Sequence, residues 1–573
     1  MLTKKDIETY IAEDNKRMDA ESKAFRRLSI EEKIKQHKAI KGLRHDSSFQ
    51  KTSGDYTLCR FLTDSNQSGL NIGDSILVNG AEATLWDFDE EGNIIVAFYG
   101  YNWFSEETEN VIEKNYGNFL VPIYSRFAAD LPDEDDKFWT SGILPARSEV
   151  EFDGNPVKWE EHVCSIEKEL GVNLFDCQRK AIAKAFASKD YYMLQGPPGT
   201  GKSFVIGIIA TMLAFKFQQR VCIAGPNYMA INNALVKCAE LVPECAKGIF
   251  KVGYPYQTTG LTFKINEEEH TIMNLSSYLS VSKINELHGL IMGMTPYTFY
   301  SSRAQGLKFD TIIIDEAGQM SVPVAMMGAI NADKIIFCGD HKQLAPIINT
   351  ENIKEALHKS IFEYMIMENN CSMLDLSFRM NGTICKLVSD LFYEGKLKSY
   401  NPDRILNIDI DDPLLSGKFP VVAKNVNGSG TQSSIEEAET IKDILCEYMN
   451  LGVPPERIGI LALFRAQCSE IRRTIGKSDQ IPVNYRKGIV IDTIDKLQGQ
   501  EREIIILSLT SGNLEYINEL TEFLYNPNKL NVALSRAKCK LILIGNFNII
   551  SQMDAYAGSY IERILTHPSV TLV

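Results

Sequence analysis

The segment GPPGTGKS, residues 196–203, restricts the fold of this 573-residue chain more than any other feature. It follows the apolar run YYMLQ and precedes the apolar run FVIGIIATML. A loop of the form G-x-x-x-x-G-K-[ST] between a strand and a helix closes its backbone N–H groups around a phosphate, and the helix dipole adds to the attraction. The sequence therefore predicts a nucleotide site at the end of a buried parallel strand.

The loop assigns a role to each of its residues. Lys202 is expected to hold the β- and γ-phosphates of ATP, and the Ser203 hydroxyl is expected to bind Mg²⁺. The remaining residues form the cradle around the phosphates: Gly196, Pro197, Gly199, Thr200 and Gly201. The predicted cofactors are accordingly ATP and Mg²⁺.

A second acidic motif completes the predicted phosphate site. The segment TIIIDE, residues 311–316, is a strongly apolar strand that ends in two carboxylates. We expect Asp315 to hold Mg²⁺ through water and Glu316 to act as the general base. The next strand, KIIFCGD, leads into a polar loop in which Gln343 is expected to sense the γ-phosphate.

Apolar runs alternate with helical segments from about residue 145 onward, which predicts parallel sheets. One group of runs comprises YYMLQG, RVCIAG, FDTIIIDEA and KIIFCGD, and a second comprises RIGILAL, GIVIDTI, REIIILSL and KLILIGN. We therefore predict an α/β fold with two units of the usual domain size. The first spans residues 129–350, with a short insertion at about 240–290, and the second spans residues 351–573.

The N-terminal region has a different pattern. Residues 1–50 are rich in charge with apolar residues at helical spacing, which predicts a helical stalk or hairpin; a frayed N-terminal helix is the alternative. Residues 51–128 contain short β-type runs and turn signals, which predict a small β-barrel. Such barrels can bind single strands through exposed aromatic residues, although most of these side chains are expected in the barrel core. The candidates are Trp86, Phe98, Tyr99, Tyr101 and Trp103.

Composition narrows the class of protein. The net charge of −14 argues against a protein that coats nucleic acid through bulk electrostatics, but it permits a narrow basic channel. The twelve cysteines include no C-x-x-C pair, so neither a disulfide framework nor a zinc ribbon is expected. No apolar run is long enough to span a bilayer. We expect a cytoplasmic protein with reduced cysteines.

Taken in order, the motifs resemble those of superfamily 1 helicases. Within that superfamily they resemble most the group that moves 5′→3′ and contains the nonsense-mediated-decay helicase. The resemblance covers roughly residues 170–548. Besides the phosphate loop, its motifs are NLFDCQ (173–178), DEAGQ (315–319), GDHKQLAPI (339–347), LSFRM (376–380), IGILALFRAQ (458–467), DTIDKLQGQE (492–501) and LNVALSRAK (530–538).

This resemblance implies two RecA-like motor domains with ATP between them, and the stalk and barrel as accessory elements on the first motor. It implies that Arg379 and Arg536 of the second motor reach the γ-phosphate, with Lys538 less certain. It also implies that Gln178 bonds the adenine edge, Phe378 stacks on the base and Glu501 contacts the ribose. The implied nucleic-acid contacts are Pro226, Asn227, Thr295 and Thr493.

One departure concerns the nucleic-acid contacts. The segment GPNYMA, residues 225–230, lacks the Ser/Thr-Asn that the family usually has at positions 227–228, so strand contact in this loop is altered.

The leading functional hypothesis is an ATPase that translocates 5′→3′ on single-stranded RNA or DNA and unwinds duplexes. An ATP-controlled clamp on nucleic acid or on a protein partner is the alternative, and a plain NTPase without a polymer substrate fits least well. We expect a monomeric motor with no membrane partner, and the stalk or barrel as the place where a protein partner could bind. The sequence does not choose between RNA and DNA.

Overall fold

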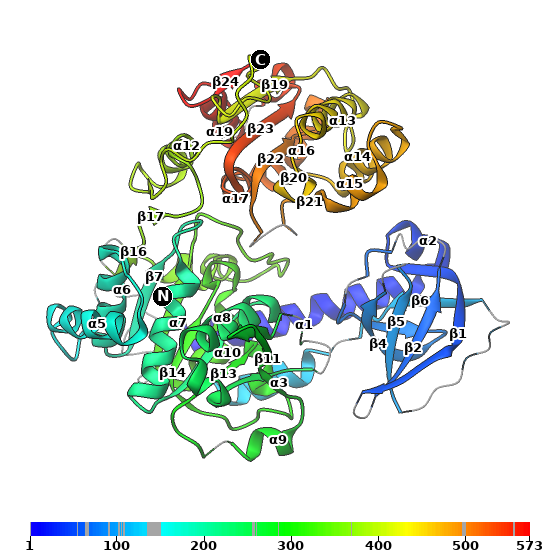
Figure 1. The fold of residues 1–573 in the computed structure, drawn as a ribbon. Helices are drawn as coiled ribbons and strands as arrows, with labels where there is room; N and C mark the ends of the chain where they lie inside the picture. Colours follow the sequence, from blue (N-terminus) through cyan, green and yellow to red (C-terminus); the bar gives the residue numbers. More distant parts are fainter. Residues whose placement is uncertain are drawn as a thin grey trace.

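The chain forms a closed barrel and two α/β units, which are separate bodies in Figure 1. The computed structural model describes residues 2–53, 56–63, 68–70, 72–89, 92–100, 104, 106, 109–117, 119–133, 150–254, 258, 260–284, 286–367, 370–495, 500–510, 512–553 and 556–573. In the view of Figure 1 the barrel lies at the right, the first α/β unit at the lower left and the second at the top. The predicted parallel sheets and the predicted barrel are both confirmed.

The first unit is built on one eight-stranded sheet in which every pair of neighbouring strands is parallel. Since parallel strands point the same way, all their carboxyl ends meet at one edge of the sheet. In spatial order the strands are β12 (Met273–Leu275), β9 (Ile249–Val252), β13 (Leu290–Met294), β8 (Arg220–Ala224), β14 (Phe309–Ile314), β15 (Ala332–Gly339), β7 (Tyr191–Gln195) and β16 (Cys371–Met373).

Helices cover both faces of this sheet, which explains why its strands are continuously apolar. Along β14, Ile312 and Ile314 enter one core and Ile313 enters the other, because successive side chains of a strand point to opposite faces. One face packs against α5 (Pro156–Leu170), α6 (Asp176–Ala187), α7 (Lys202–Thr211), the π-turn η1 (Met212–Lys216) and α8 (Tyr228–Leu241). The other packs against α1 (Lys4–Arg27), α3 (Val121–Ala129), α9 (Tyr278–Ser282), η3 (Pro296–Tyr300), α10 (Val322–Ala329) and α11 (Ile361–Met365).

Two expected boundaries of the first unit differ from the structure. The sheet continues past residue 350, because β16 pairs with β7 as its edge strand. The expected insertion at 240–290 is smaller, because β9 and β12 belong to the main sheet. Only the hairpin of β10 (Thr262–Ile265) and β11 (Glu268–Thr271) forms a sheet of its own. Short turns η2 (Pro243–Gly248), η4 (Ala317–Gln319) and η5 (Glu355–His358) complete the unit.

The second unit is built on a six-stranded sheet whose neighbouring strands are also all parallel. In spatial order the strands are β21 (Val490–Thr493), β20 (Ile458–Ala462), β22 (Arg502–Ser508), β23 (Ala537–Gly545), β19 (Val421–Asn425) and β24 (Thr571–Leu572). One face packs against α12 (Gly382–Phe392), α16 (Leu514–Leu524), α17 (Pro527–Leu534), α18 (Phe547–Ile550) and α19 (Tyr556–Leu565). The other packs against α13 (Ile435–Asn450), α14 (Arg465–Lys477) and α15 (Val483–Gly488), with the turn η6 (Pro455–Arg457) beside them.

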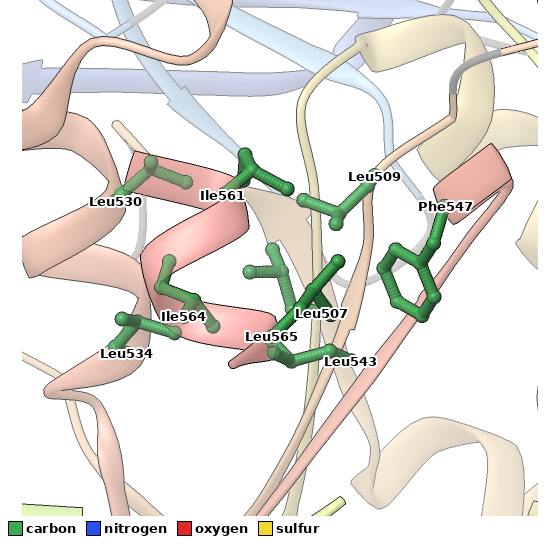
Figure 2. Close-up of a pocket in the computed structure, with 9 residues that line it drawn as sticks. All are labelled: Leu507, Leu509, Leu530, Leu534, Leu543, Phe547, Ile561, Ile564 and Leu565. Atoms are coloured by element: carbon green, nitrogen blue, oxygen red, sulfur yellow. The ribbon is translucent and has the colours of Figure 1, made fainter. Parts of the chain in front are cut away.

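The C-terminal helix closes the core of the second unit. Figure 2 shows Ile561, Ile564 and Leu565 of α19 facing a small apolar cavity at the sheet. The other lining residues are Leu507, Leu509, Leu530, Leu534, Leu543 and Phe547. Since all nine side chains are apolar, the cavity belongs to the packed core of this unit.

The barrel closes in the order β1-β2-β5-β4-β3-β6. Its strands are β1 (Ala39–Ser53), β2 (Tyr56–Leu62), β3 (Ser75–Val78), β4 (Ala81–Phe88), β5 (Ile94–Tyr99) and β6 (Asn110–Lys114). The long β1 pairs with β6 near its start and with β2 near its end, and register shifts on both sides let it bend around the barrel. The barrel therefore begins at residue 39, inside the segment expected to be stalk, and α3 lies outside it on the first unit.

The barrel aromatics divide between core and surface. Phe98 is fully buried, so it is unavailable to a single strand. Tyr99 exposes 78% of its surface, and Tyr56 lies between it and the half-buried Trp86 with ring centroids 5.9 Å from each. Tyr101 and Trp103 lie outside the described residues.

Helix α1 joins the barrel to the first unit. A capping box of Thr3 and Asp6 starts the helix, and Ile7 and Tyr10 pack into the first core. At its far end the ring of Phe25 lies 4.4 Å from that of Tyr116, which follows β6. The six-residue helix α2 (Ile30–Lys35) then leads into β1. Helix α3 follows the barrel in the chain and packs in the same core as α1. Two helices therefore attach the barrel to the first unit.

A buried carboxylate anchors α1. Asp14 is 4% exposed, and its Oδ1 accepts hydrogen bonds from Arg17 Nη2 at 2.7 Å and from Thr350 Oγ1 at 2.8 Å. Its Oδ2 accepts one from the Tyr124 hydroxyl at 2.9 Å. A buried carboxylate needs such partners, since an unpaired charge away from water is costly. The sequence analysis did not single out Asp14.

We predict that Asp14→Ala destabilises the first unit by about 2–3 kcal/mol, because it leaves the buried hydroxyls of Tyr124 and Thr350 without this acceptor and leaves Arg17 with Glu21 alone. Asp19→Ala in the same helix is the matched control, since Asp19 is largely exposed and its ion pair is with the exposed Lys23 of the same helix. That change should cost less than about 1 kcal/mol. Urea unfolding followed by circular dichroism measures both, and equal losses would contradict the anchor role of Asp14.

Candidate nucleotide and nucleic-acid site

The loop at residues 196–203 lies between β7 and α7, and its shape depends on glycine. Gly199 and Gly201 have φ values of +74° and +79°, in the left-handed region that favours glycine. A Cβ on Gly199 would lie 2.5 Å from Cβ of Arg379. Thr200 Oγ1 donates to the Pro197 carbonyl at 2.8 Å and holds the loop closed. The loop therefore packs directly against the segment that leads into the second unit.

Lys202 lies between two carboxylates at the end of β14. Its Nζ is 2.7 Å from Asp315 Oδ1 and 2.6 Å from Glu316 Oε1. Burial alone would lower the pKa of Lys202, but the two carboxylates outweigh burial and raise it. Burial raises the pKa of Asp315, while Lys202 holds the pKa of Glu316 below its usual value against the opposing effect of burial. The three predicted side chains thus form one charged cluster.

Backbone strain marks Glu316. Its φ of +53° is uncommon for a residue other than glycine, and its Oε2 accepts a hydrogen bond from Gln319 Nε2 at 2.8 Å. Such strain persists where the surrounding structure fixes the residue, and it concentrates at functional sites. The carboxylate is thereby aimed toward the phosphate loop.

The donor set fits a nucleotide with a hard divalent cation. The exposed Ser203 lies in the first turn of α7, and Asp315 follows β14, so a hydroxyl and a carboxylate oxygen are available beside the loop. Mg²⁺ is usually bound by one or two carboxylates together with substrate phosphates, rather than by a cage of protein ligands. In the described parts of the chain, no group of three or more His, Cys, Asp or Glu side chains could hold a metal on its own.

Gln178 and Phe378 meet beside the loop. Gln178 is buried, and its Nε2 donates to the Thr200 carbonyl at 3.3 Å. A Cβ on Gly201 would lie 3.0 Å from Gln178 Nε2 and 3.8 Å from the Phe378 ring. The structure therefore brings the two predicted base-reading residues together at the loop.

The sequence analysis missed two rings beside Phe378. Phe175, Phe378 and Tyr400 form a triangle in which each pair of ring centroids is 5.1 Å apart. Tyr400 is about half exposed at 49%. The sequence around Tyr400 carries no signal of this role, because only folding brings the ring to Phe378.

Glu501 links two cations of the second unit. It pairs with Arg379 and, at 2.7 Å, with Lys538 Nζ. Burial would raise the pKa of Glu501, but Arg379 and Lys538 together hold it below its ordinary value. Arg379 Nη1 also donates to the Ser535 carbonyl at 3.1 Å, which fixes the side chain beside the loop.

Arg536 is a buried cation with no direct ion pair. It is 3% exposed and donates to two carbonyls, of Val532 at 3.0 Å and of Gln500 at 3.4 Å. Within the described part of the chain, no carboxylate lies within ion-pair distance of its guanidinium. Burial and the like charge of Arg379 lower the pKa of Arg536 to about 9, and Glu316 is the largest opposing influence. Arg536 of the second unit therefore lies within electrostatic range of Glu316 in the charged cluster of the first unit.

Gln343 lies in the loop after β15 and points to a carboxylate of the same loop. Its Nε2 donates to Asp340 Oδ2 at 2.9 Å, while Gln195 Nε2, at the end of β7, donates to Asp340 Oδ1 at 3.0 Å. Asp340 thus connects the predicted sensor to the strand that carries the phosphate loop.

The predicted nucleic-acid contacts are only partly brought together. Pro226, Asn227 and Thr295 follow the adjacent strands β8 and β13, whose last residues, Ala224 and Met294, are in register. Asn227 Oδ1 accepts from Ala230 N at 2.9 Å as the N-cap of α8. Thr295 Oγ1 lies 3.0 Å from Thr298 Oγ1. Thr493 ends β21 on the other sheet and is 7% exposed.

The comparisons with known proteins match the two units separately. Residues 178–349 match one AAA domain family, and residues 357–548 match another. The human DNA replication ATP-dependent helicase/nuclease DNA2 is 28% identical over 426 residues, covering 68% of this chain and 38% of that protein. The regulator of nonsense transcripts 1 homolog of Neurospora crassa is 25% identical over 435 residues, covering 67% of this chain and 38% of that protein. The resemblance to superfamily 1 helicases is confirmed.

A third relative is covered more fully. The uncharacterized ATP-dependent helicase MJ0104 of Methanocaldococcus jannaschii is 26% identical over 478 residues, covering 67% of this chain and 69% of that protein. The chain spans less than two fifths of the length of the human and Neurospora relatives, at 38% of each. The solved arterivirus nonstructural protein 10 (helicase) covers 85% of the chain at 11% identity and a TM-score of 0.38, which is too low for an inference about fold.

Among the helices of the described residues, none combines the length and the apolar character that a membrane crossing requires.

We predict that Arg536→Met raises the free energy of unfolding by about 1 kcal/mol or leaves it unchanged, because it removes a buried charge that lacks an ion-pair partner. Arg457→Met in the same unit is the matched control. It breaks the half-exposed pair with Glu503 and should lower stability by up to about 1 kcal/mol. Urea unfolding of the protein without nucleotide compares them. A loss of several kcal/mol in Arg536→Met would mean that Arg536 is a structural residue.

Proposed function

We propose that this protein is an ATP-dependent helicase that translocates 5′→3′ on single-stranded nucleic acid. In this proposal ATP binds between two RecA-like motor units, which correspond to the two α/β units. One observation carries the proposal: Arg536 of the second unit is buried, has no ion pair among the described residues, and lies within electrostatic range of Glu316, which pairs with Lys202 of the phosphate loop. A desolvated cation at that place is suited to meet an anion that arrives with the substrate.

The first unit would bind ATP and activate water. Lys202 would move from Asp315 and Glu316 to the β- and γ-phosphates, which frees the Glu316 carboxylate to accept a proton from the attacking water. Ser203 and Asp315 would hold Mg²⁺, which neutralises phosphate charge when it is bound. Gln178 and Phe378 would hold the adenine, with Tyr400 as an additional ring beside it.

The second unit would stabilise the charge that develops on the transferred phosphoryl group. Arg379 and Arg536 would both contribute, and a contribution of this kind is worth about 10³–10⁵ in rate. Arg379 would exchange its pair with Glu501 for the phosphate, and Glu501 would be left with Lys538 and the ribose. Because Arg536 belongs to the second unit, hydrolysis would depend on how the two units are closed on each other.

The nucleic acid would cross the carboxyl edges of both sheets. Pro226, Asn227 and Thr295 would contact it on the first sheet and Thr493 on the second. The side chains of Asn227 and Thr295 already make local hydrogen bonds, so backbone groups of these loops are the expected contacts there. The names of the relatives, which include ATP-dependent helicases, support the activity.

The deciding experiment is ATP turnover with and without single-stranded DNA or RNA of matched sequence, at two salt concentrations. Turnover that rises with either polymer supports the proposal, and the preferred polymer identifies the substrate, since 2′-OH contacts distinguish RNA from DNA. Turnover that no polymer stimulates would contradict it. Stimulated turnover without strand displacement would identify a clamp.

We predict that Glu316→Gln lowers turnover at least about 100-fold and leaves ATP affinity within a few-fold, because it removes the general base but keeps the shape of the site. Lys202→Ala should lose turnover together with binding. Glu355→Gln, which changes an exposed carboxylate of the same unit, is the control. Wild-type turnover in pure Glu316→Gln protein would exclude Glu316 as the base.

We predict that unwinding requires a 5′ single-stranded overhang. Three duplexes of equal length, with a 5′ overhang, a 3′ overhang or blunt ends, are compared in a strand-displacement assay with ATP. Faster opening of the duplex with the 3′ overhang would assign the opposite polarity.

A further inference from the structure

A buried hydroxyl joins the two α/β units next to the proposed phosphate sensor. Tyr393, at the C-terminal end of α12, is 3% exposed, and its hydroxyl donates to Asp340 Oδ2 at 2.6 Å. Asn531 Nδ2 of α17 donates to the same hydroxyl at 2.8 Å. Asp340 follows β15 of the first unit, whereas α12 and α17 belong to the core of the second. The hydroxyl therefore completes a chain of hydrogen bonds across the boundary.

The carboxylate of Asp340 is the centre of this chain. Its Oδ1 accepts from Gln195 Nε2 at 3.0 Å and from the backbone N–H of Lys342 at 3.1 Å. Its Oδ2 accepts from Tyr393 and also from Gln343 Nε2 at 2.9 Å. The sensor and the tyrosine therefore share one oxygen, and a shift of either donor changes the position that suits the other.

Two further contacts attach the same loop to the second unit. Asn531 Nδ2 donates to the Lys342 carbonyl at 2.6 Å, and Asn528 Nδ2 donates to the His341 carbonyl at 3.0 Å. Both asparagines lie in α17, only a few residues before Arg536. Helix α17, which donates hydrogen bonds to the loop of Gln343, is thus followed directly by the segment that contains Arg536.

Electrostatics keep Tyr393 in the form that donates. Burial and the nearby Asp340 charge both raise its pKa well above the ordinary value, so the hydroxyl is protonated throughout the physiological range. Arg536 acts in the opposite direction on the pKa of Tyr393, because the cation lies within electrostatic range of the phenol. The hydrogen bonds that join Asn531, Tyr393 and Asp340 therefore lie within electrostatic range of Arg536.

We propose that Tyr393 is a positioning residue that couples Gln343 to the closure of the two units. Through Asp340, its hydroxyl holds Gln343 in the geometry for phosphate contact only while the second unit is docked. The same docking brings Arg536 to the phosphate site. The contact of Gln343 with the γ-phosphate and the stabilisation of phosphoryl transfer by Arg536 therefore depend on the same closed state. This inference rests on the proposed function and assigns the regulation of the same site.

Removal of the hydroxyl should weaken closure more than ATP binding. Tyr393→Phe keeps the ring in the core but leaves the buried Asp340 with one donor fewer, and Asn531 Nδ2 keeps only the Lys342 carbonyl of its two acceptors. A bond of this type to a charged group is worth enough to shift the closed population about tenfold. We expect polymer-stimulated turnover to fall about tenfold, with ATP affinity changed less than about twofold, because the groups that bind ATP lie mainly on the first unit.

The experiment compares Tyr393→Phe with Tyr525→Phe in the full chain. Tyr525 is also fully buried in the second unit, but its hydroxyl donates to the Leu509 carbonyl at 2.9 Å within that unit. The measurements are turnover with and without a single-stranded oligonucleotide, affinity for a fluorescent ATP analogue, and oligonucleotide affinity with and without a non-hydrolysable ATP analogue. Tyr393→Phe should lose most of the stimulation and most of the effect of the ATP analogue on oligonucleotide affinity. Tyr525→Phe should keep both at a similar melting temperature.

Asn528→Ala tests the same coupling if Tyr393→Phe does not fold. Asn528 is only half-buried, and its substitution removes one hydrogen bond to the Gln343 loop, the bond to the His341 carbonyl. It should lower stimulated turnover in the same direction by about threefold, as expected for one neutral hydrogen bond. Equal stimulation in both tyrosine variants, or an ATP affinity that falls as much as turnover, would overturn the coupling role. Wild-type turnover that the oligonucleotide does not stimulate would instead refute the proposed function. Failure of the coupling role and failure of the proposed function are therefore distinguishable.

Discussion

Every strand in each α/β unit runs parallel to its neighbours, and this constraint decides where chemistry can occur. Parallel strands bring their carboxyl ends to one edge, and the loops that follow them carry the polar side chains. In the first sheet β14, β15 and β7 are neighbours, so the acids after β14, the Gln343 loop after β15 and the phosphate loop after β7 converge. Both faces of the sheet are covered by helices, which leaves this edge as the place for buried charge to meet a ligand.

Charge at the boundary between the units is balanced unevenly. On the first unit Lys202 is shared by two carboxylates. On the second unit Arg379 and Lys538 share the carboxylate of Glu501, and the hydrogen-bond partners of Arg536 among the described residues are two carbonyls. Glu316 of the first unit and Arg536 of the second lie within electrostatic range of each other. Phosphates bound between the two units would give the desolvated Arg536 an anionic partner. They would also pair with Lys202 in place of Asp315 and Glu316. This exchange of partners would link ATP binding to closure of the two units.

The barrel is carried by the first unit through helices rather than by a flexible linker. α1 and α3 pack in the same core, and the buried Asp14 gives α1 a fixed attachment to Tyr124 of α3 and to Thr350 beyond β15. The connecting helix α1 is packed at one end in the core of the first unit and at the other against Tyr116, which follows β6 of the barrel. The exposed ring of Tyr99 and the neighbouring Tyr56 and Trp86 lie on the outside of that mounted barrel.

The sequence by itself determined the local chemistry. The phosphate loop, the acids after an apolar strand and the two sets of buried strands are patterns of adjacent residues, so periodicity and spacing were enough to predict an α/β fold, the phosphate loop and its acids. The roles of Gln178, Phe378, Arg379, Glu501 and Arg536 were predicted only from the resemblance to superfamily 1 helicases. The boundaries were less accurate. Ile40 and Leu43 fit a helix as well as a strand, and only their pairing with β6 and inclusion in the barrel core made them part of the barrel. The tertiary structure alone decided the pairings of Glu501, the ring of Tyr400 beside Phe378, the anchor at Asp14 and the bond from Tyr393 to Asp340. These contacts join residues that are far apart in the chain, and they depend on the order of strands in each sheet and on how the units dock, neither of which local periodicity encodes.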